Sequence, residues 1–555
     1  MVKKRKKQML FHTIKRYAIE NKSLLIICVG YVALLLSVIS WGIPNNSHPY
    51  TYHMDEWHQL QAVKATFKNL TPNIEGAAHG TIFHFLLTGI YLVPFYIFGI
   101  INPFIIKSGL SAIPMQANLF ELLRLNTLLF GIGSLFILNH IIKKYFKINP
   151  TVTLVLFTFT PVWIYLSNYF KYDIALTFWI LTTIFFLLKF GSKPNVRNYI
   201  VAGIAASLTL AVKLSALPLL PIYIFGFFYF TEPKRRQYKT LFVGAITFVA
   251  VFLLVGIPDV LLGKANYGDF LSSNLIATST TTGNFILDYR PWWLYILLRV
   301  MPLDFGHGFF VIFLMSILYW TVIFIKKIST KDMLLIKNML FIFISLVVFA
   351  ASLWPLQIGA TGNRLLVLLP FLAIASGVFL PHIKIRVSRW GRRVVVLLII
   401  FILSLQLLES LAIIYIKNGT DARQASSAWL VDNVRKGSMI GIENIPIYQL
   451  LPDVALKEFY EKQNNPTVKT NFNYEVIDAS TKELPSIIIV TNKELEGEYL
   501  KKSPKKDLLK RLDREGYVVK REFKPSPLLY FIMENELQMF TSGLVPIPTI
   551  TIYIK

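Results

Sequence analysis

The stretch Tyr50-Thr-Tyr-His-Met-Asp55-Glu56-Trp57-His-Gln-Leu-Gln-Ala62 places two adjacent acidic residues in a short polar segment. It follows an apolar run at about residues 23–43, which has the length of a membrane span. An isolated Asp-Glu pair is usually part of a solvated loop. If the preceding run crosses a membrane outward, however, both carboxylates lie at the outer surface, where ionisable groups commonly have a function.

The composition is that of a polytopic membrane protein. The 555 residues are 54% hydrophobic and 14% aromatic, and the mean hydropathy is +0.53. The net charge of +26 is confined to residues 1–417, because residues 418–555 carry nearly equal numbers of acidic and basic residues. Most of the excess lies in short loops between apolar runs, the positive-inside pattern, so the charge indicates topology and no nucleic-acid partner.

Eleven apolar runs have about the length of a membrane span or nearly so. They lie at about 23–43, 82–101, 119–141, 151–168, 173–190, 199–230, 240–262, 309–325, 335–354, 365–381 and 394–416.

Basic clusters set the orientation of these runs. The amino end is basic and lacks a small-residue cleavage site, which predicts a retained first helix with a cytoplasmic amino terminus. The other clusters predicted to be cytoplasmic are Lys143–Lys147, Lys193 with Arg197, Lys234–Lys239, Lys326–Lys331 and Lys384–Arg393.

Parity separates spanning runs from others. The amino end and Lys143–Lys147 share one side, so an even number of crossings lies between them. Run 82–101 contains Pro94 and has polar flanks, and we predict that it lies along or dips into the outer leaflet within a first outer loop at 44–118. Run 199–230 has both ends inside and Lys213 at its middle, which predicts two short helices. The total is about eleven transmembrane helices in residues 1–417, with a second outer loop at 263–308.

Residues 418–555 have a different pattern. Helical spacing at Asp421–Val434 and Leu508–Glu515 alternates with short strand patterns that begin at Gly437, Ser486 and Gly516. This alternation predicts a small, partly parallel α/β domain. The predicted fold class is therefore a polytopic α-helical protein of the plasma membrane with a C-terminal extracytoplasmic α/β domain.

Charged residues of both signs are predicted to meet at the outer face. Carboxylates supply a general base or metal ligands, and Arg and Lys bind phosphate. Each residue alone suits a helix cap or an interfacial anchor, but together they suit a phosphorylated lipid and a polar co-substrate. The candidate acids are Asp55, Glu56 and Asp173, and the candidate binding residues are His79, Arg124, Lys213, Arg290 and Arg364.

Several other functions have no signal. The sequence contains no Gly-rich nucleotide loop, HExxH or CxxC motif. Its single cysteine, Cys28, lies in the first apolar run, so no intrachain disulfide can form.

The order of motifs resembles the GT-C membrane glycosyltransferases. The resemblance is greatest to protein O-mannosyltransferases and lipid A aminoarabinose transferases (glycosyltransferase family 39-like) and covers about residues 10–415. The motifs that carry it are Asp55-Glu56-Trp-His-Gln-Leu-Gln-Ala, Ile82-Phe-His-Phe-Leu-Leu, Glu121-Leu-Leu-Arg124-Leu-Asn, Tyr165-Leu-Ser-Asn-Tyr-Phe-Lys-Tyr-Asp173, Gly203-Ile-Ala-Ala-Ser-Leu-Thr-Leu-Ala-Val-Lys213 and Asn363-Arg364-Leu-Leu-Val-Leu-Leu-Pro370.

The resemblance implies inverting transfer of a sugar from a polyprenyl-phosphate donor at the outer face. It implies Asp55 as the general base with Glu56 beside it, and it matches Asp173, Lys213 and Arg124 to family positions. The Lys-Pro-Pro of the family is Ala78-His79-Gly80 here, so His79 is the candidate for the role of the lysine.

The chemistry of the transfer agrees with this implication. A base must deprotonate the acceptor hydroxyl of a protein, glycan or lipid, and cations must stabilise the leaving phosphate. Because the leaving group is a monophosphate, Lys213, Arg124, Arg290 or Arg364 could serve without a metal cofactor. A divalent ion held by Asp55 and Asp173 is the alternative.

Two other classes of protein remain alternatives. A flippase or transporter for lipid-linked sugars would carry ionisable groups through the bilayer midplane. A non-catalytic lipid-binding assembly protein would keep the arginines without needing Asp55. Asp55 and Asp173 within reach of one cavity would favour the enzyme.

Overall fold

The structure is a computed structural model. It describes residues 19–45, 51–70, 81–102, 113–262, 292–325, 333–353, 362–382, 389–443, 471–491, 504–524 and 549–555.

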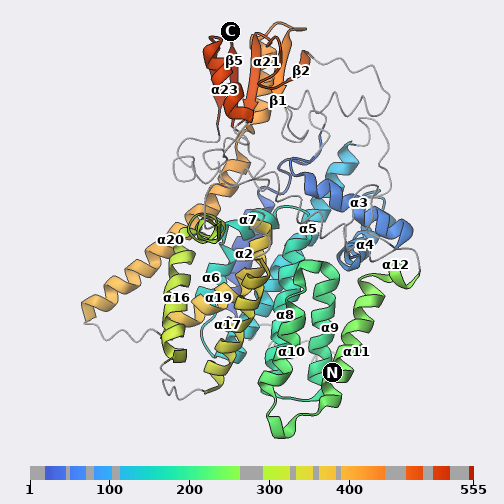
Figure 1. Cartoon of the computed structure of the whole chain (residues 1–555), viewed down its shortest axis with the longest axis vertical. Coiled ribbons are helices and arrows are strands. Elements are labelled where there is room, and N and C mark those ends of the chain that lie inside the picture. Colours follow the sequence, from blue (N-terminus) through green and yellow to red (C-terminus); the bar gives the residue numbers. More distant parts are fainter. Residues whose placement is uncertain are drawn as a thin grey trace, which may run out of the picture.

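A bundle of apolar helices forms the membrane module (Figure 1). Its helices are α2 (Lys22–Leu36), α5 (Ile113–Ile141, continued by a π-helical turn to Phe146), α6 (Thr151–Thr158), α7 (Pro161–Ser167), α8 (Tyr172–Ser192), α9 (Val196–Val212), α10 (Leu219–Phe230), α11 (Tyr238–Val255), α16 (His307–Ile325), α17 (Met333–Leu353), α19 (Leu369–His382) and α20 (Arg389–Asn418).

In the described part of the chain, six helices are long and apolar enough to cross a membrane: α5 with its π turn, α8, α11, α16, α17 and α20. Five shorter apolar helices accompany them: α2, α9, α10, α19 and α4 (Phe83–Ile97). The predicted class of helical membrane protein is confirmed, and the total of about eleven spans stays a prediction.

Two apolar runs are interrupted. Run 199–230 breaks after Val212, where Lys213 is extended and a 3-10 turn leads into α10, as the sequence predicted. Run 151–168 was predicted to be one helix but is two, α6 and α7. Pro161 begins the second, and a proline cannot donate the backbone hydrogen bond that a continuous helix needs.

The two ends of the bundle differ. Lys143 donates to the Glu20 carbonyl and to Asn21 Oδ1, so the start of α2 and the end of α5 share one end, consistent with the parity argument. The turn between α10 and α11 lies at the lower end in Figure 1, and the C-terminal sheet lies beyond the upper end.

Short helices cover the upper end of the bundle. Helices α3 (Met54–Asn69) and α4 lie side by side there, and Gly89 allows their close packing, since a Cβ at this position would clash with the Phe67 ring. The other short elements of this region are α12 (Pro258–Leu261), α14 (Trp292–Tyr295), a π-helical segment (Ile296–Val300), α15 (Met301–Phe305) and α18 (Gly362–Leu365).

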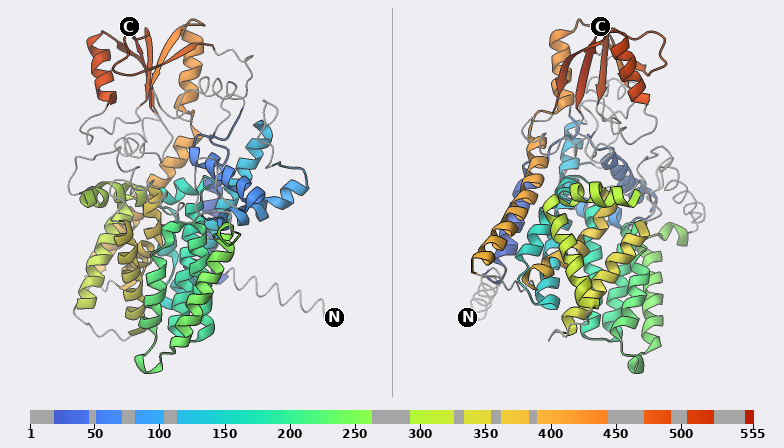
Figure 2. Two further views of the ribbon diagram at one scale, coloured as in Figure 1. Left: turned by 45° about the vertical axis from the view of Figure 1, so that its right-hand side comes forward. Right: turned by 60° about the vertical axis from the view of Figure 1, so that its left-hand side comes forward.

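The C-terminal region forms a five-stranded sheet between two helices (Figure 2). The strand order is β2-β1-β3-β5-β4, with parallel β1–β2 and β1–β3 pairs and antiparallel β3–β5 and β4–β5 pairs. The strands are β1 (Met439–Glu443), β2 (Asn473–Ile477), β3 (Ile487–Thr491), β4 (Val518–Phe523) and β5 (Ile550–Ile554), and the helices are α21 (Ala422–Asn433) and α23 (Pro504–Arg514).

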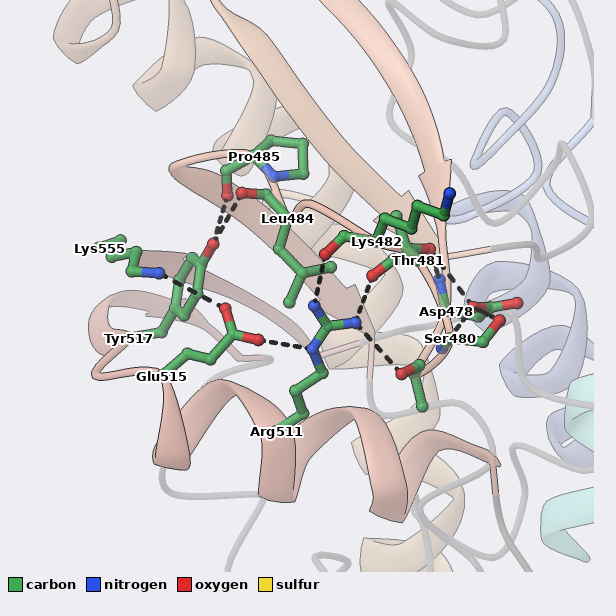
Figure 3. A network of polar contacts seen from close by, with 11 residues as sticks. Asp478, Ser480, Thr481, Lys482, Leu484, Pro485, Arg511, Glu515, Tyr517 and Lys555 are labelled. Atoms are coloured by element: carbon green, nitrogen blue, oxygen red, sulfur yellow. Dashed lines mark hydrogen bonds and ion pairs between the residues drawn. The ribbon is translucent and has the colours of Figure 1, made fainter.

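Each helix of this domain covers its own face of the sheet. Leu430 of α21 packs with Ile440, and Leu508 and Leu512 of α23 pack with Ile488. Arg511 anchors α23 to the loop before β3 by hydrogen bonds to the carbonyls of Ala479, Thr481 and Lys482 (Figure 3). The mixed α/β arrangement predicted from the sequence is found.

Candidate active site

The acidic motif lies in the first turn of α3. His53 is the N-cap, and the Asp55 backbone N–H donates to His53 Nδ1 at 3.3 Å. Successive helical residues point about 100° apart, so the neighbouring side chains of Asp55 and Glu56 face different surroundings. The Asp55 side chain is 39% exposed, whereas Glu56 is fully buried.

Glu56 forms a buried pair with Arg124 of α5. Arg124 Nε and Nη2 donate to the two Glu56 oxygens at 2.9 and 2.7 Å, and the Phe170 N–H donates to Glu56 Oε1 at 2.9 Å. Arg124 Nη1 also donates to the carbonyls of Ile39 and Trp41, where the chain leaves α2. These contacts pair the charges of Glu56 and Arg124 with each other. They also give hydrogen bonds to backbone carbonyls that lack a partner at the end of a helix.

Asp55 belongs to a chain of alternating charges. Lys171 Nζ lies 2.5 Å from Asp55 Oδ2 and 3.9 Å from Asp173 Oδ2, and Lys213 Nζ lies 2.7 Å from Asp173 Oδ1. The chain joins α3, the turn before α8, the first turn of α8 and the break after α9. Asp55 and Asp173, far apart in sequence, thus meet at one ammonium group.

Lys171 is the member of this chain that sequence reasoning missed. It stands inside the Tyr165–Asp173 motif, two residues before Asp173, and its side chain is only 2% exposed. A buried lysine needs counter-charges. The sequence did contain a signal for Lys171, because this lysine lies between two predicted helices and only two residues before Asp173.

Two further cations border the chain of charges. Lys213 is 22% exposed, and its Nζ lies 4.4 Å from the centre of the Tyr172 ring. Arg364 of α18 is close enough to Asp173 and Tyr172 to interact electrostatically. Its buried Nη1 has no hydrogen-bond partner among the described residues, so this donor is available to a ligand.

The charges set the protonation of the acidic motif. Burial alone would raise the pKa of the Asp55 carboxyl, but Lys171 and the nearby histidines together hold it well below its usual range. Burial, aided by the charge of Lys171, lowers the pKa of His53 to about 3. At neutral pH Asp55 is ionised and His53 is neutral.

The donor set between Asp55 and Asp173 does not suit a divalent cation. Lys171 stands between the two carboxylates and contacts both. Among the described residues, no group of three His, Cys, Asp or Glu side chains gathers with the spacing of a metal site. The absence of a metal cofactor stays a prediction that chelation can test.

Two candidates lie outside the described residues, namely His79 and Arg290. The nearby His84 of α4, also in the predicted outer loop, is fully buried and stacks on Phe170 at 5.6 Å between ring centroids. Of the eight predicted site residues, Asp55 and Asp173 meet at Lys171, and Lys213 and Arg364 lie near Asp173. Glu56 and Arg124 pair with each other beside them.

Comparison with protein-family models supports the resemblance to GT-C membrane glycosyltransferases that the sequence indicated. Residues 104–262 match the family described as dolichyl-phosphate-mannose-protein mannosyltransferase. This segment includes Arg124, Lys171, Asp173 and Lys213. Comparison with curated protein sequences finds no match.

Solved structures with remote similarity include those of ArnT and AglB. Apo ArnT from Cupriavidus metallidurans is 12% identical with a TM-score of 0.46, and the alignment covers 96% of this chain and 98% of ArnT. AglB from Archaeoglobus fulgidus, an archaeal oligosaccharyltransferase, is 14% identical with a TM-score of 0.44, over 80% of this chain. The chain covers only 60% of AglB.

Proposed function

We propose that the protein transfers a sugar, with inversion, from a polyprenyl-phosphate donor to an acceptor hydroxyl at the outer membrane face. The acceptor is a protein, a glycan or a lipid. In this proposal the amino terminus is cytoplasmic, and the upper end of the bundle and the C-terminal domain are extracytoplasmic. The observation that carries it is the chain of charges from Asp55 through Lys171 and Asp173 to Lys213, with Arg364 near Asp173.

Asp55 acts as the general base. One of its oxygens is held by Lys171, and the exposed carboxylate accepts the proton of the acceptor hydroxyl. The acceptor oxygen then forms a bond to the anomeric carbon, and the bond from that carbon to the phosphate oxygen breaks. The electron pair leaves with the polyprenyl phosphate, so one displacement inverts the anomeric configuration.

The cations stabilise the leaving phosphate. Lys171, Lys213 and Arg364 face two carboxylates, which leaves one net positive charge for the single negative charge of a sugar phosphodiester. A second negative charge develops on the phosphate as the bond breaks, where fixed cations are most effective. Lys213 and Arg364 take this role, because Lys213 is partly exposed and the Arg364 Nη1 donor has no hydrogen-bond partner in the described part of the chain.

Glu56, Arg124 and Asp173 position these groups. The Glu56–Arg124 pair fixes the first turn of α3 against α5 and the turn before α8. Asp173 orients Lys213 through its 2.7 Å contact.

Asp55→Asn tests the proposal. General-base removal costs about 10²–10⁴-fold in rate, whereas donor affinity and the amount of folded protein should stay near wild type. The measurement is consumption of defined polyprenyl-phosphate sugars by the purified protein in lipid. Lys68→Gln, an exposed change on the same helix, is the control and should keep full activity.

Three outcomes would contradict the proposal. Consumption of no polyprenyl-phosphate sugar, together with movement of such a lipid across vesicles, would identify a transporter. Near-normal transfer by Asp55→Asn together with loss of transfer per folded molecule in Glu56→Gln would make Glu56 the base. Lipid binding without either activity would indicate an assembly protein.

A further inference from the structure

The junction between α20 and α21 contacts the acidic motif directly. Arg423, the second residue of α21, is fully buried, and its guanidinium carbon lies 3.4 Å from the centre of the Tyr52 ring. Asp421 holds Arg423 in place, with Nε to Oδ1 at 2.8 Å and Nη2 to Oδ2 at 2.7 Å. Tyr52 stands three residues before Asp55.

The position of Tyr52 is fixed by contacts with the segment that follows α2. Its N–H donates to the Gly42 carbonyl at 2.9 Å, and its ring meets Trp41 edge-on at 5.4 Å. Gly42 has a φ of +64°, and a Cβ there would lie 2.6 Å from Tyr52 Cδ2. The ring is thus held between Gly42 on one side and Arg423 from the C-terminal domain.

A second contact from the junction reaches the other half of the site. Lys417, in the last turn of α20, is 3% exposed and donates to Asn168 Oδ1 at 2.9 Å. Its Nζ lies 4.2 Å from the centre of the Tyr169 ring and 4.8 Å from that of Tyr165, a cation–π arrangement. Asn168 and Tyr169 directly precede the segment that carries Lys171.

The two contacts converge on the charge chain. Tyr52 leads to His53, which caps α3 and receives the Asp55 N–H. His53 also packs on Tyr169, with 4.6 Å between ring centroids. The junction therefore contacts both segments that must meet for Asp55 to reach Lys171.

We propose that the junction between α20 and the C-terminal domain is a positioning element of the active site, acting through Lys417 of α20 on Tyr169 and through Arg423 of α21 on Tyr52. This inference rests on the proposed function and extends it to residues outside the site. Arg423 and Lys417 act through other residues and touch no substrate. Displacing the domain moves Asp55 away from its reacting position, while the donor-binding residues Lys213 and Arg364, on other elements, stay in place.

Arg423→Ala tests the proposal in the full-length protein in lipid. A misplacement of about 1 Å can cost about 10²-fold in rate, so we expect turnover to fall on the order of 10²-fold while the KM for the donor stays within about twofold. Amide hydrogen exchange in residues 51–57 should increase. Tyr52→Leu should reproduce both effects, Tyr52→Phe should keep the wild-type behaviour, and Arg423→Ala combined with Tyr52→Leu should be no worse than either alone.

Arg511→Ala is the matched control. Arg511 also stabilises the C-terminal domain, through Glu515 and three loop carbonyls, but its partners among the described residues include neither Tyr52 nor the bundle. It should increase exchange within the domain and leave turnover per folded molecule unchanged. Arg423→Lys, which keeps the charge, should show a smaller loss than Arg423→Ala if the latter folds poorly.

The outcomes separate this proposal from the proposed function. Increased exchange in residues 51–57 of Arg423→Ala, without transfer by any variant, would support the positioning role and overturn the transferase. Normal turnover and exchange in Arg423→Ala would overturn the positioning role and leave the transferase standing. An equal loss of turnover in Arg511→Ala would also overturn it, because general domain stability would then explain the effect.

Discussion

Asp55 and Glu56 are neighbours in one helical turn, yet their ion pairs are opposite in kind. Glu56 is fully buried, and Arg124 occupies both of its oxygens while also binding two backbone carbonyls. Asp55 is 39% exposed and gives one oxygen to Lys171, which it shares with Asp173. The first pair has all its partners, and the second retains capacity for a ligand.

This difference divides the work of the acidic motif. A completely paired buried charge fixes geometry but is costly to disturb. A partly exposed carboxylate with a shared partner can accept a proton without leaving an orphaned charge behind. The motif therefore combines one structural acid and one available for chemistry, and the helix geometry alone separates them.

Breaking the buried Glu56–Arg124 pair should have the largest effect on the stability of the fold. Glu56→Gln leaves Arg124 buried without its counter-charge, and removing one partner of a buried pair costs about 3–5 kcal/mol. We expect a large loss of folded protein and a lower unfolding temperature in detergent. Asp55→Asn is the comparison: it should lower the unfolding temperature less, since Asp55 is partly exposed and Lys171 keeps Asp173 as a second counter-charge. Equal stability of the two variants would show that the pairs do not differ as described.

The sequence predicted two members of the charge chain around Asp55, Asp173 and Lys213, but it did not predict the Glu56–Arg124 pair. The break at Lys213 was readable because a lysine and Pro218 interrupt an apolar run, and Asp173 was placed at the same end by topology. Lys171 was not identified, because its role depends on α3 meeting the turn before α8, a contact that local spacing does not encode.

Arg124 illustrates the same limit in another way. The sequence shows a cation at the start of a predicted span, where binding of phosphate is a natural prediction. Its partners in the structure are Glu56 and carbonyls left open where α2 ends earlier than its apolar run. The exact end of a helix and the direction of a long side chain depend on packing, so the pairing could not be foreseen. Its role in binding substrate stays a prediction.

Removing the charge of Lys213 or of Arg364 should have the next largest effect, a loss of affinity for the donor. Lys213→Met and Arg364→Gln each remove a charge-assisted contact, worth about 1.5–3 kcal/mol, from the phosphate. We expect donor affinity to fall about 10- to 150-fold, as measured by binding of the polyprenyl-phosphate sugar to the purified protein. Lys68→Gln should bind normally. Unchanged affinity in both variants would remove these residues from the site.

Lys171→Met should have the smallest effect on rate at neutral pH, because Asp55 stays exposed and Lys213 still neutralises Asp173. Its effect should appear on acidification. The groups facing Asp55 are Lys171, His53 and His58, and removing the lysine leaves burial, which raises the pKa of the carboxyl.

Loss of Lys171 should raise the pKa of the Asp55 carboxyl. In the wild type the lowered pKa keeps Asp55 ionised in acid, and it stabilises the fold above the usual carboxyl pKa of about 4, a contribution lost as the pH falls further. In Lys171→Met the carboxyl protonates at a higher pH, so the acidic limb of kcat/KM should move upward. Lys171→Arg keeps the charge and should retain the wild-type limb. If the acidic limb of kcat/KM did not shift in Lys171→Met, the proton that controls the rate would not be on Asp55. The Asp55–Lys171 pair would then be as structural as the Glu56–Arg124 pair.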